Sequence, residues 1–311
     1  MKILFATHDE ADYLASCLWD GFQEVVGVEN VYDAGNNFTL HEAPLVQSNY
    51  APYHNVSSGR GNGKRLNIER NFDLLVLNAC FLKNHDWHYA INLSHRLREG
   101  GKIAFVEGGD DAKEVIDVPR LPRSVHRFRR EISERTASLN ATHLTFAAPS
   151  RWVQLTRDYP TERVIDVYFA GGAGSNSIRW EMMKYVFGTN KPFTFVFSEQ
   201  STKYHFSPQQ NFDLLRQSKI ALCPAGNGCS CMRDAEVWAS GAIPLYLGHQ
   251  ARVRDPYWPG RFVSLSSLPE TIDELLDRDL SDEHQKQLDR VSRLHTTAAR
   301  ARKILDVVGL S

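Results

Sequence analysis

The stretch SKIALCPAGNGCSCMRDAEVWASGAIPLYLG, residues 218 to 248, decides the fold of this chain. Its apolar run at 220–223 predicts a buried strand, and the proline and glycines that follow predict a tight loop. A helix is expected to begin near Ser230, and the apolar run 243–247 predicts the next strand. Continuous apolar strands that alternate with helices are typical of a parallel sheet covered on both faces.

The loop and helix inside this stretch form a candidate anion site. The turn and the start of the helix contain four small or polar residues: Gly226, Asn227, Gly228 and Ser230. Free amides and the positive end of a helix hold phosphate well, and Arg233 adds a two-pronged donor. Glu236, one turn further on, is an acceptor for the vicinal hydroxyls of a ribose. The set predicts a nucleotide-diphosphate site, and the alternative is an ordinary turn with an exposed Arg233–Glu236 ion pair.

The same alternation of strand and helix runs through both halves of the chain. Strands are predicted at 2–6, 73–77, 103–107 and 144–147, and again at 166–170 and 193–197. Helices are predicted near 14–25, 89–98 and 124–138, and another follows the glycine loop 171–174. We therefore expect two α/β domains, 1–160 and 161–311. The polar helical segment 281–308 could pack back across the first domain.

Composition excludes several classes of protein. The 311 residues are 42% hydrophobic and 23% charged, which excludes a disordered, coiled-coil or collagen-like chain. With 36 Lys and Arg against 37 Asp and Glu, no overall positive field attracts nucleic acid or an anionic membrane. The apolar run at the start of the chain is too short for a signal peptide, and no later run reaches the roughly 18 apolar residues of a membrane helix. We expect a cytoplasmic protein without membrane insertion.

The ordered motifs resemble those of a known family. P-x-G-x-G at 224–228, R-x-x-E at 233–236 and S-G-x-I-P at 240–244 resemble the donor half of exostosin-like glycosyltransferases. The resemblance covers about 164–250. It implies the GT-B fold, in which two Rossmann-like α/β domains face an interdomain cleft. It also implies that Arg233 contacts the donor diphosphate, that Glu236 contacts the donor ribose, and that Gly171 and Gly172 face the sugar phosphate.

One departure bears on the mechanism. Many retaining GT-B enzymes carry a second glutamate eight positions before the ribose-binding one, and here that position is Gly228. The pattern favours an inverting mechanism, which needs a general base for the acceptor hydroxyl. Loops after strand ends qualify, and we predict Asp110 in the glycine-acid loop that follows 103–107, with His8 after the first strand as the alternative. The alternative for Asp110 is a solvated acidic turn without a catalytic role.

Further patterns concern the acceptor and a metal. The densest basic cluster includes Arg123, Arg127 and Arg130, which predicts contacts with an anionic acceptor if it is not simply a solvated helix face. Asp277-Arg278-Asp279 spells D-x-D, yet it ends a polar helical stretch, where capping explains it better. We expect no metal and no cofactor beyond the nucleotide-sugar co-substrate, a UDP-sugar.

The expected function is transfer of a sugar from a nucleotide-diphosphate donor to a hydroxyl of a glycan or another anionic acceptor. Two alternatives stay open. One is a glycosyltransferase that acts on hydroxymethylated bases of DNA, where a basic strip would hold phosphates and the base would be flipped out. The other is a nucleotide- or glycan-binding module without turnover, because a fold alone does not establish catalysis.

Overall fold

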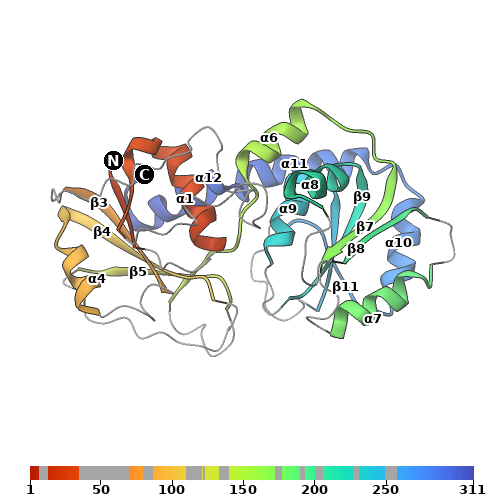
Figure 1. The fold of residues 1–311 in the computed structure, drawn as a ribbon, viewed down its shortest axis with the longest axis horizontal. Helices are drawn as coiled ribbons and strands as arrows, with labels where there is room; N and C mark the ends of the chain where they lie inside the picture. The colour runs from red at the N-terminus through yellow and green to blue at the C-terminus, as the bar shows by residue number, and fades with distance from the viewer. Residues whose placement is uncertain are drawn as a thin grey trace. The chain divides into compact units, whose positions relative to one another are not determined.

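The computed structural model describes residues 1–6, 13–34, 71–79, 87–109, 121, 123–132, 140–171, 177–189, 193–199, 206–226, 231–248 and 258–311. The chain divides into two compact units (Figure 1). The first unit contains residues 1–147 and 297–311, and the second unit contains residues 148–296. The C-terminal helix therefore belongs to the first unit, although it follows the second in sequence.

The first unit is built on a parallel sheet with the strand order β2-β1-β3-β4-β5-β6. All five neighbouring pairs are parallel. The strands are β1 (Ile3–Ala6), β2 (Val31–Asp33), β3 (Phe72–Asn78), β4 (Leu97–Glu107), β5 (Val125–Arg129) and β6 (Thr142–His143). The central strands are buried along most of their length, as expected for a parallel sheet covered on both faces.

Helices cover both faces of this sheet. They are α1 (Tyr13–Val26), the short 3₁₀ helix η1 (Val28–Asn30), α4 (Trp87–Ser94) and α12 (Thr297–Val308). Residues of α4 pack in one apolar cluster with alternate residues of the strands, such as Leu75 and Leu77. On the other side, α1 packs closely against α12. A Cβ at Gly21 would lie 2.1 Å from the backbone oxygen of Thr297, so only glycine permits this helix contact.

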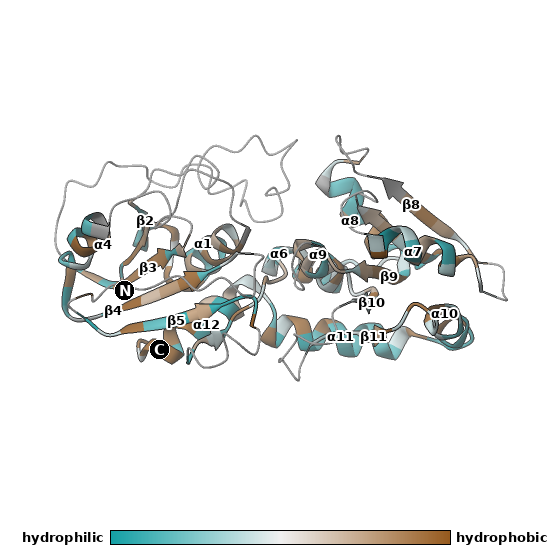
Figure 2. Cartoon of the chain, turned by 90° about the horizontal axis from the view of Figure 1, so that it is seen from below, coloured by the Kyte–Doolittle hydropathy of each residue, from teal (hydrophilic) through white to brown (hydrophobic). Residues whose placement is uncertain are grey.

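The second unit contains a smaller parallel sheet, in the order β11-β10-β9-β7-β8. The strands are β7 (Ile165–Gly171), β8 (Phe195–Glu199), β9 (Ser218–Pro224), β10 (Ile243–Leu247) and β11 (Arg261–Val263). The helices are α6 (Ser150–Asp158), α7 (Ser177–Val186), α8 (Pro208–Arg216), α9 (Met232–Ser240), α10 (Leu268–Leu276) and α11 (Ser281–Leu294). Figure 2 shows the strands as predominantly hydrophobic, whereas α11 alternates between hydrophobic and hydrophilic residues.

Side chains that alternate along each strand divide the second unit into two packing layers. Val167 and Phe169 of β7 join one apolar cluster with residues of α7 and α10. Tyr168 points to the opposite face, where its hydroxyl bonds Asn211 of α8. On that face α9 contacts α6, α8 and α11. The helix that follows β9 is therefore held by three others, and its N-terminal turn is fixed beside the sheet.

The predicted alternation of strands and helices is confirmed at most elements, and two local predictions are wrong. The helix expected at 124–138 is not formed at its start, because 125–129 is strand β5, paired in parallel with β4. The strand expected at 144–147 is buried chain without strand pairing, and β6 ends before it. The polar segment 281–308 breaks between α11 and α12, where Thr296 forms an isolated bridge with Ala148. None of the helices in the described part of the chain is long and apolar enough to cross a membrane.

Candidate functional site

The strand order of the second unit identifies the edge at which a ligand should bind. In a sheet of this doubly wound order, ligands bind beyond the carboxyl ends of the two strands from which the chain winds in opposite directions. Those strands are β7 and β9, which pair with each other. β7 ends at Gly171, and β9 ends at Pro224 just before Gly226. Two of the predicted donor residues therefore lie at this position.

The N-terminal turn of α9 is held in place by buried polar contacts. The carboxylate of Asp234 is completely buried and accepts a hydrogen bond of 2.9 Å from the backbone N–H of Cys231. At its other end the helix stops at Gly241, whose φ of 73° belongs to the left-handed region that favours glycine. A Cβ at Gly241 would also lie 2.9 Å from the side chain of Leu288. The S-G-x-I-P motif is thus explained by local packing.

Arg233 and Glu236 lie on one face of α9 and meet a third residue, Asn211 of α8. Nη1 of Arg233 lies 3.6 Å from Oε2 of Glu236, and the same nitrogen donates to Oδ1 of Asn211 at 3.4 Å. Nδ2 of Asn211 donates to Oε2 of Glu236 at 3.3 Å, and Tyr168 donates to Oδ1 of Asn211 at 2.6 Å. Asn211 therefore joins the arginine, the glutamate and the sheet in one network.

Burial decides the electrostatics of this network. The Glu236 side chain is 7% exposed, whereas Arg233 is 22% exposed. Burial raises the pKa of Glu236, and the positive charge of Arg233 and the hydrogen bond from Asn211 both lower it. Burial also raises the pKa of Tyr168, so its hydroxyl stays a donor. The result is a positioned carboxylate behind a more accessible guanidinium.

The structure adds a residue that the sequence analysis missed, Arg179 in the first turn of α7. A Cβ at Gly226 would lie 3.4 Å from Nη2 of Arg179, and a Cβ at Gly171 would lie 3.7 Å from Nη1. The guanidinium therefore reaches the carboxyl ends of both switch-point strands. Burial lowers the pKa of Arg179 and nearby Arg233 lowers it further, whereas Cys231 and Asp234 raise it. Two cations thus lie close together at this edge.

The remaining predicted donor and catalytic residues lie outside the described residues. They are Gly172, Asn227, Gly228, Ser230, Asp110 and His8. Asp110 directly follows Gly109, the last residue of the described segment 87–109, and Gly109 lies just beyond the carboxyl end of β4. His8 follows the end of β1, a strand that pairs with both β2 and β3. Their roles stay predictions.

The arginines predicted to hold the acceptor lie on or near β5 in the first unit, not on a helix. Arg123 donates to three backbone oxygens of β4, those of Leu97, Arg98 and Gly101. Arg127 lies 3.5 Å from Oε2 of Glu107, and Arg129 donates to Oε1 of the same carboxylate at 2.9 Å.

Arg130, the last arginine of this cluster, is only 4% exposed. Its guanidinium lies 3.5 Å from the carboxylate of Glu131 and stacks over the ring of Phe146 at 4.6 Å from the ring centre. Since Arg127, Arg129 and Arg130 each face a carboxylate, much of this positive charge is compensated within the unit. The predicted contact with an acceptor stays a prediction.

The D-x-D sequence has a structural role. Asp277 caps the end of α10, and Asp279 accepts hydrogen bonds from the backbone N–H and the hydroxyl of Ser281 at the start of α11. Among the described residues, no group of three or more His, Cys, Asp or Glu side chains could hold a metal ion.

Comparison with known proteins identifies the fold. No protein-family model matches the sequence, and no curated protein sequence matches it. Among solved structures, AviGT4, a glycosyltransferase involved in avilamycin A biosynthesis, is 11% identical with a TM-score of 0.55, over 99% of this chain and 97% of that one. The GtfA/B complex is 11% identical with a TM-score of 0.46, and TarM is 10% identical with a TM-score of 0.42.

These likenesses differ in extent. This chain spans 56% of the GtfA/B chain and 54% of the TarM chain, whereas it matches AviGT4 over nearly the whole of both. The match to AviGT4 agrees with the two parallel sheets found in this chain. The chain therefore has the α/β fold of GT-B glycosyltransferases, with two Rossmann-like units.

Proposed function

We propose that this protein is a glycosyltransferase that transfers a sugar from a nucleotide-diphosphate donor, a UDP-sugar, to a hydroxyl of an acceptor. The donor site comprises the carboxyl ends of β7 and β9 with the first turns of α7 and α9. Gly171, Gly226, Arg233 and Glu236 belong to its described part. Gly172, Asn227, Gly228 and Ser230 complete the predicted loops.

One observation carries the proposal: each helix after a switch-point strand has an arginine in its first turn. Arg179 is the third residue of α7, and Arg233 is the second residue of α9. Backbone amides at a helix N-terminus favour phosphate, and a guanidinium in the same turn adds a two-pronged donor. A diphosphate would bind both guanidiniums and both helix N-termini. Glu236, held by Asn211, would accept hydrogen bonds from the ribose hydroxyls.

The same arrangement suits the departure of a nucleoside diphosphate. Negative charge develops on the leaving phosphate as the bond to the anomeric carbon breaks, and fixed guanidiniums stabilise that charge. We propose that Arg179 and Arg233 supply this stabilisation without a metal ion. Asp110 is the proposed general base for the acceptor hydroxyl, with inversion at the anomeric carbon, and His8 is the alternative base.

The acceptor is proposed to be a glycan or another anionic molecule. Arg123, Arg127 and Arg130 are the residues proposed to contact it. Because these arginines have partners within the first unit, any contribution to acceptor binding would come from the more exposed parts of Arg123 and Arg127. Arg130 is buried, so we expect it to act by supporting the sheet edge.

The test is the release of nucleoside diphosphate from a panel of nucleotide sugars, with and without candidate acceptors. Turnover or donor hydrolysis releases UDP, and a variant with Arg179→Gln and Arg233→Gln should lose that release. Arg290→Gln is the matched control, because Arg290 is an exposed arginine of α11 in the same unit. Binding of UDP without release from any sugar would instead support a nucleotide- or glycan-binding module.

The DNA alternative requires its own acceptor. Duplex DNA with hydroxymethylated bases belongs in the same assay, and label transfer to it would support that alternative. The near-zero net charge counts against it, since phosphate contacts supply most of the affinity for DNA. The compensated arginines of β5 count against it for the same reason.

A further inference from the structure

A second basic site lies in the second unit, at the edge of the sheet opposite to Gly171 and Gly226. It is a cavity of about 620 Å³ beside the amino-terminal ends of β7 and β9. Arg163 precedes β7, and Lys219 is the second residue of β9. Five Arg and Lys side chains line the cavity against two carboxylates. This volume is in the range of sites for small organic ligands.

The two least exposed cations of the cavity are Arg163 and Arg216. Arg163 donates to the backbone oxygens of Ser218 and Ser240, which leaves further N–H groups of its guanidinium. Arg216 donates to the backbone oxygen of Tyr159, and its side chain is 11% exposed. As far as the described residues show, the buried Nε–H of Arg216 has no acceptor.

The two guanidiniums also interact electrostatically. Burial lowers the pKa of Arg163 to about 10, and the charge of Arg216 contributes to the shift. The carboxylate nearest to Arg216 belongs to Asp213, 3.9 Å away and nearly half exposed, so it compensates little. Burial and Arg163 lower the pKa of His284, which also lines the cavity, to about 4. A bound anion between Arg163 and Arg216 would offset this unfavourable potential.

Three more exposed cations surround this pair and come from separate elements. They are Arg157 at the end of α6, Lys219 in β9 and Arg278 before α11. Each has a carboxylate outside the cavity lining: Asp289 lies 3.5 Å from Arg157, Asp166 lies 2.7 Å from Lys219, and Glu283 contacts Arg278.

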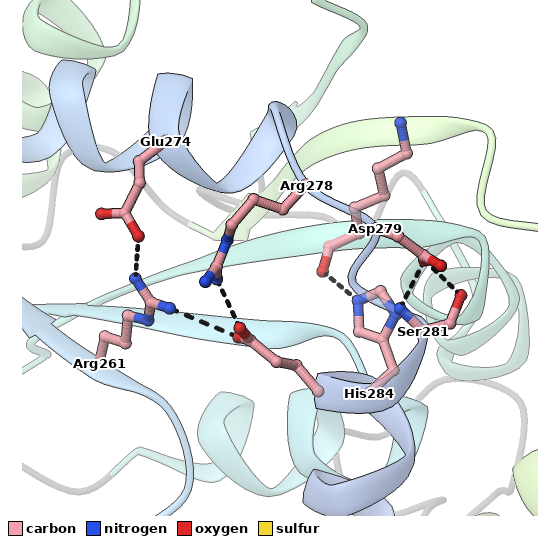
Figure 3. A network of polar contacts seen from close by, with 8 residues as sticks. Arg261, Glu274, Arg278, Asp279, Ser281 and His284 are labelled. Carbon is pink, nitrogen blue, oxygen red and sulfur yellow. Dashed lines mark hydrogen bonds and ion pairs between the residues drawn. The ribbon is translucent and has the colours of Figure 1, made fainter.

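The two carboxylates of the lining belong to Asp279 and Glu162. Asp279 is turned towards Ser281, whose N–H and hydroxyl it accepts, as Figure 3 shows. Glu283, which lies outside the lining, accepts from both Arg261 and Arg278. Glu162 is exposed. Among the described residues, the least compensated positive charge of the cavity therefore belongs to Arg163 and Arg216.

The geometry points to a binding site for a small molecule that carries two phosphate groups, held by Arg163 and Arg216 inside the cavity and by Arg157, Lys219 and Arg278 around them. Paired guanidiniums match phosphate oxygens through two parallel hydrogen bonds, and the outer cations would hold the second group. The site does not depend on the proposed function, because it uses the opposite edge of the sheet and none of the donor residues.

Calorimetry with inorganic pyrophosphate on the full chain tests the site. We expect Arg216→Gln to weaken binding by about tenfold, since it removes charge-assisted hydrogen bonds, and Arg157→Gln to weaken it about threefold to tenfold. Arg157 lies on the surface of the unit, so this second variant keeps the test valid if Arg216→Gln fails to fold. Arg290→Gln removes the same charge from an exposed position outside the cavity and should leave the affinity unchanged.

The other arms separate this site from the donor site and from simple charge attraction. Arg233→Ala should leave this binding event intact. Loss of all pyrophosphate binding in Arg233→Ala, with full binding in the Arg157 and Arg216 variants, would overturn the proposal. Equal weakening by Arg157→Gln and Arg290→Gln would overturn it as well. Inorganic phosphate should bind at least tenfold more weakly than pyrophosphate, and equal affinity would contradict a site for two phosphate groups.

Discussion

The carboxyl edges of the two sheets use arginine in opposite ways. In the first unit, Arg127 and Arg129 approach a single buried carboxylate, Glu107, and neutralise it. In the second unit, Arg179 and Arg233 lie near each other in the first turns of two helices. Glu236 lies 3.6 Å from Arg233. The first arrangement stabilises the fold, whereas the second brings two guanidiniums to the edge where we propose that the donor binds. Clusters of arginine in a sequence therefore do not by themselves identify an anion site.

The largest expected effect tests whether residues of the first unit catalyse the transfer while residues of the second unit bind the donor. Asp110→Asn should lower kcat by about a hundredfold or more, because general-base catalysis contributes roughly 10² to 10⁴. UDP affinity, measured by calorimetry, should change little. If activity survives, His8→Gln is expected to show the loss instead. A large loss of UDP affinity in Asp110→Asn would break the division between the two units.

A second test concerns the structural role of the arginines in the first unit. Glu107→Gln should lower the free energy of unfolding by about 3 kcal/mol, because it leaves the buried charge of Arg129 and the partly buried charge of Arg127 without a carboxylate. Urea denaturation measures the change. Glu24→Gln, an exposed glutamate of α1, is the matched control and should change stability little. Unaltered stability in Glu107→Gln would mean that these arginines are available to a ligand.

A third test addresses the donor site. Arg233→Ala and Glu236→Gln should each weaken UDP binding by roughly tenfold to 150-fold, since a hydrogen bond to a charged group contributes about 1.5 to 3 kcal/mol. Calorimetry measures the affinity. Glu270→Gln, at an exposed position in α10, controls for the loss of one negative charge. UDP affinity that stays the same in both variants would remove these residues from the donor site.

The smallest expected effect concerns the opposite edge of the second sheet. His284 has a pKa of about 4 in the folded protein against a usual 6.5, so the unfolded chain binds more protons between these values. Stability should therefore fall by about 2 kcal/mol as the pH drops from 6.5 to 4. His284→Gln should flatten this dependence in thermal unfolding, and His88→Gln, an exposed histidine of α4, should not. The same slope in all three proteins would contradict the assignment.

The sequence predicts β7, β9 and β10 well, because each is a continuous apolar run bounded by turn residues, whereas it gave no prediction for β11. β10 begins and ends where predicted, and β7 and β9 differ from their predictions by one or two residues. The error at β5 has a physical cause. Arg127 and Arg129 alternate with apolar residues, but their burial depends on Glu107 in a neighbouring strand. Local patterns do not contain that partner.

The residues of the proposed donor site were predictable in part. Arg233 and Glu236 follow a glycine loop at helical spacing, so their proximity follows from the sequence. Asn211 and Arg179 were missed, since they come from other helices that the fold brings together. Each has a local feature that could have drawn attention to it. Arg179 is a cation in the first turn of a helix, where it opposes the helix dipole, and Asn211 directly precedes the buried Phe212.

The sequence alone predicts most of the alternation of buried strands and helices and the proximity of Arg233 and Glu236, because these depend on neighbours within a few residues. The tertiary structure decided which strands lie at the switch point, which arginines are neutralised, and that α12 belongs to the first unit. Those features depend on contacts between residues far apart in the chain. The net charge at each edge of a sheet, once ion pairs are taken into account, follows only from those contacts.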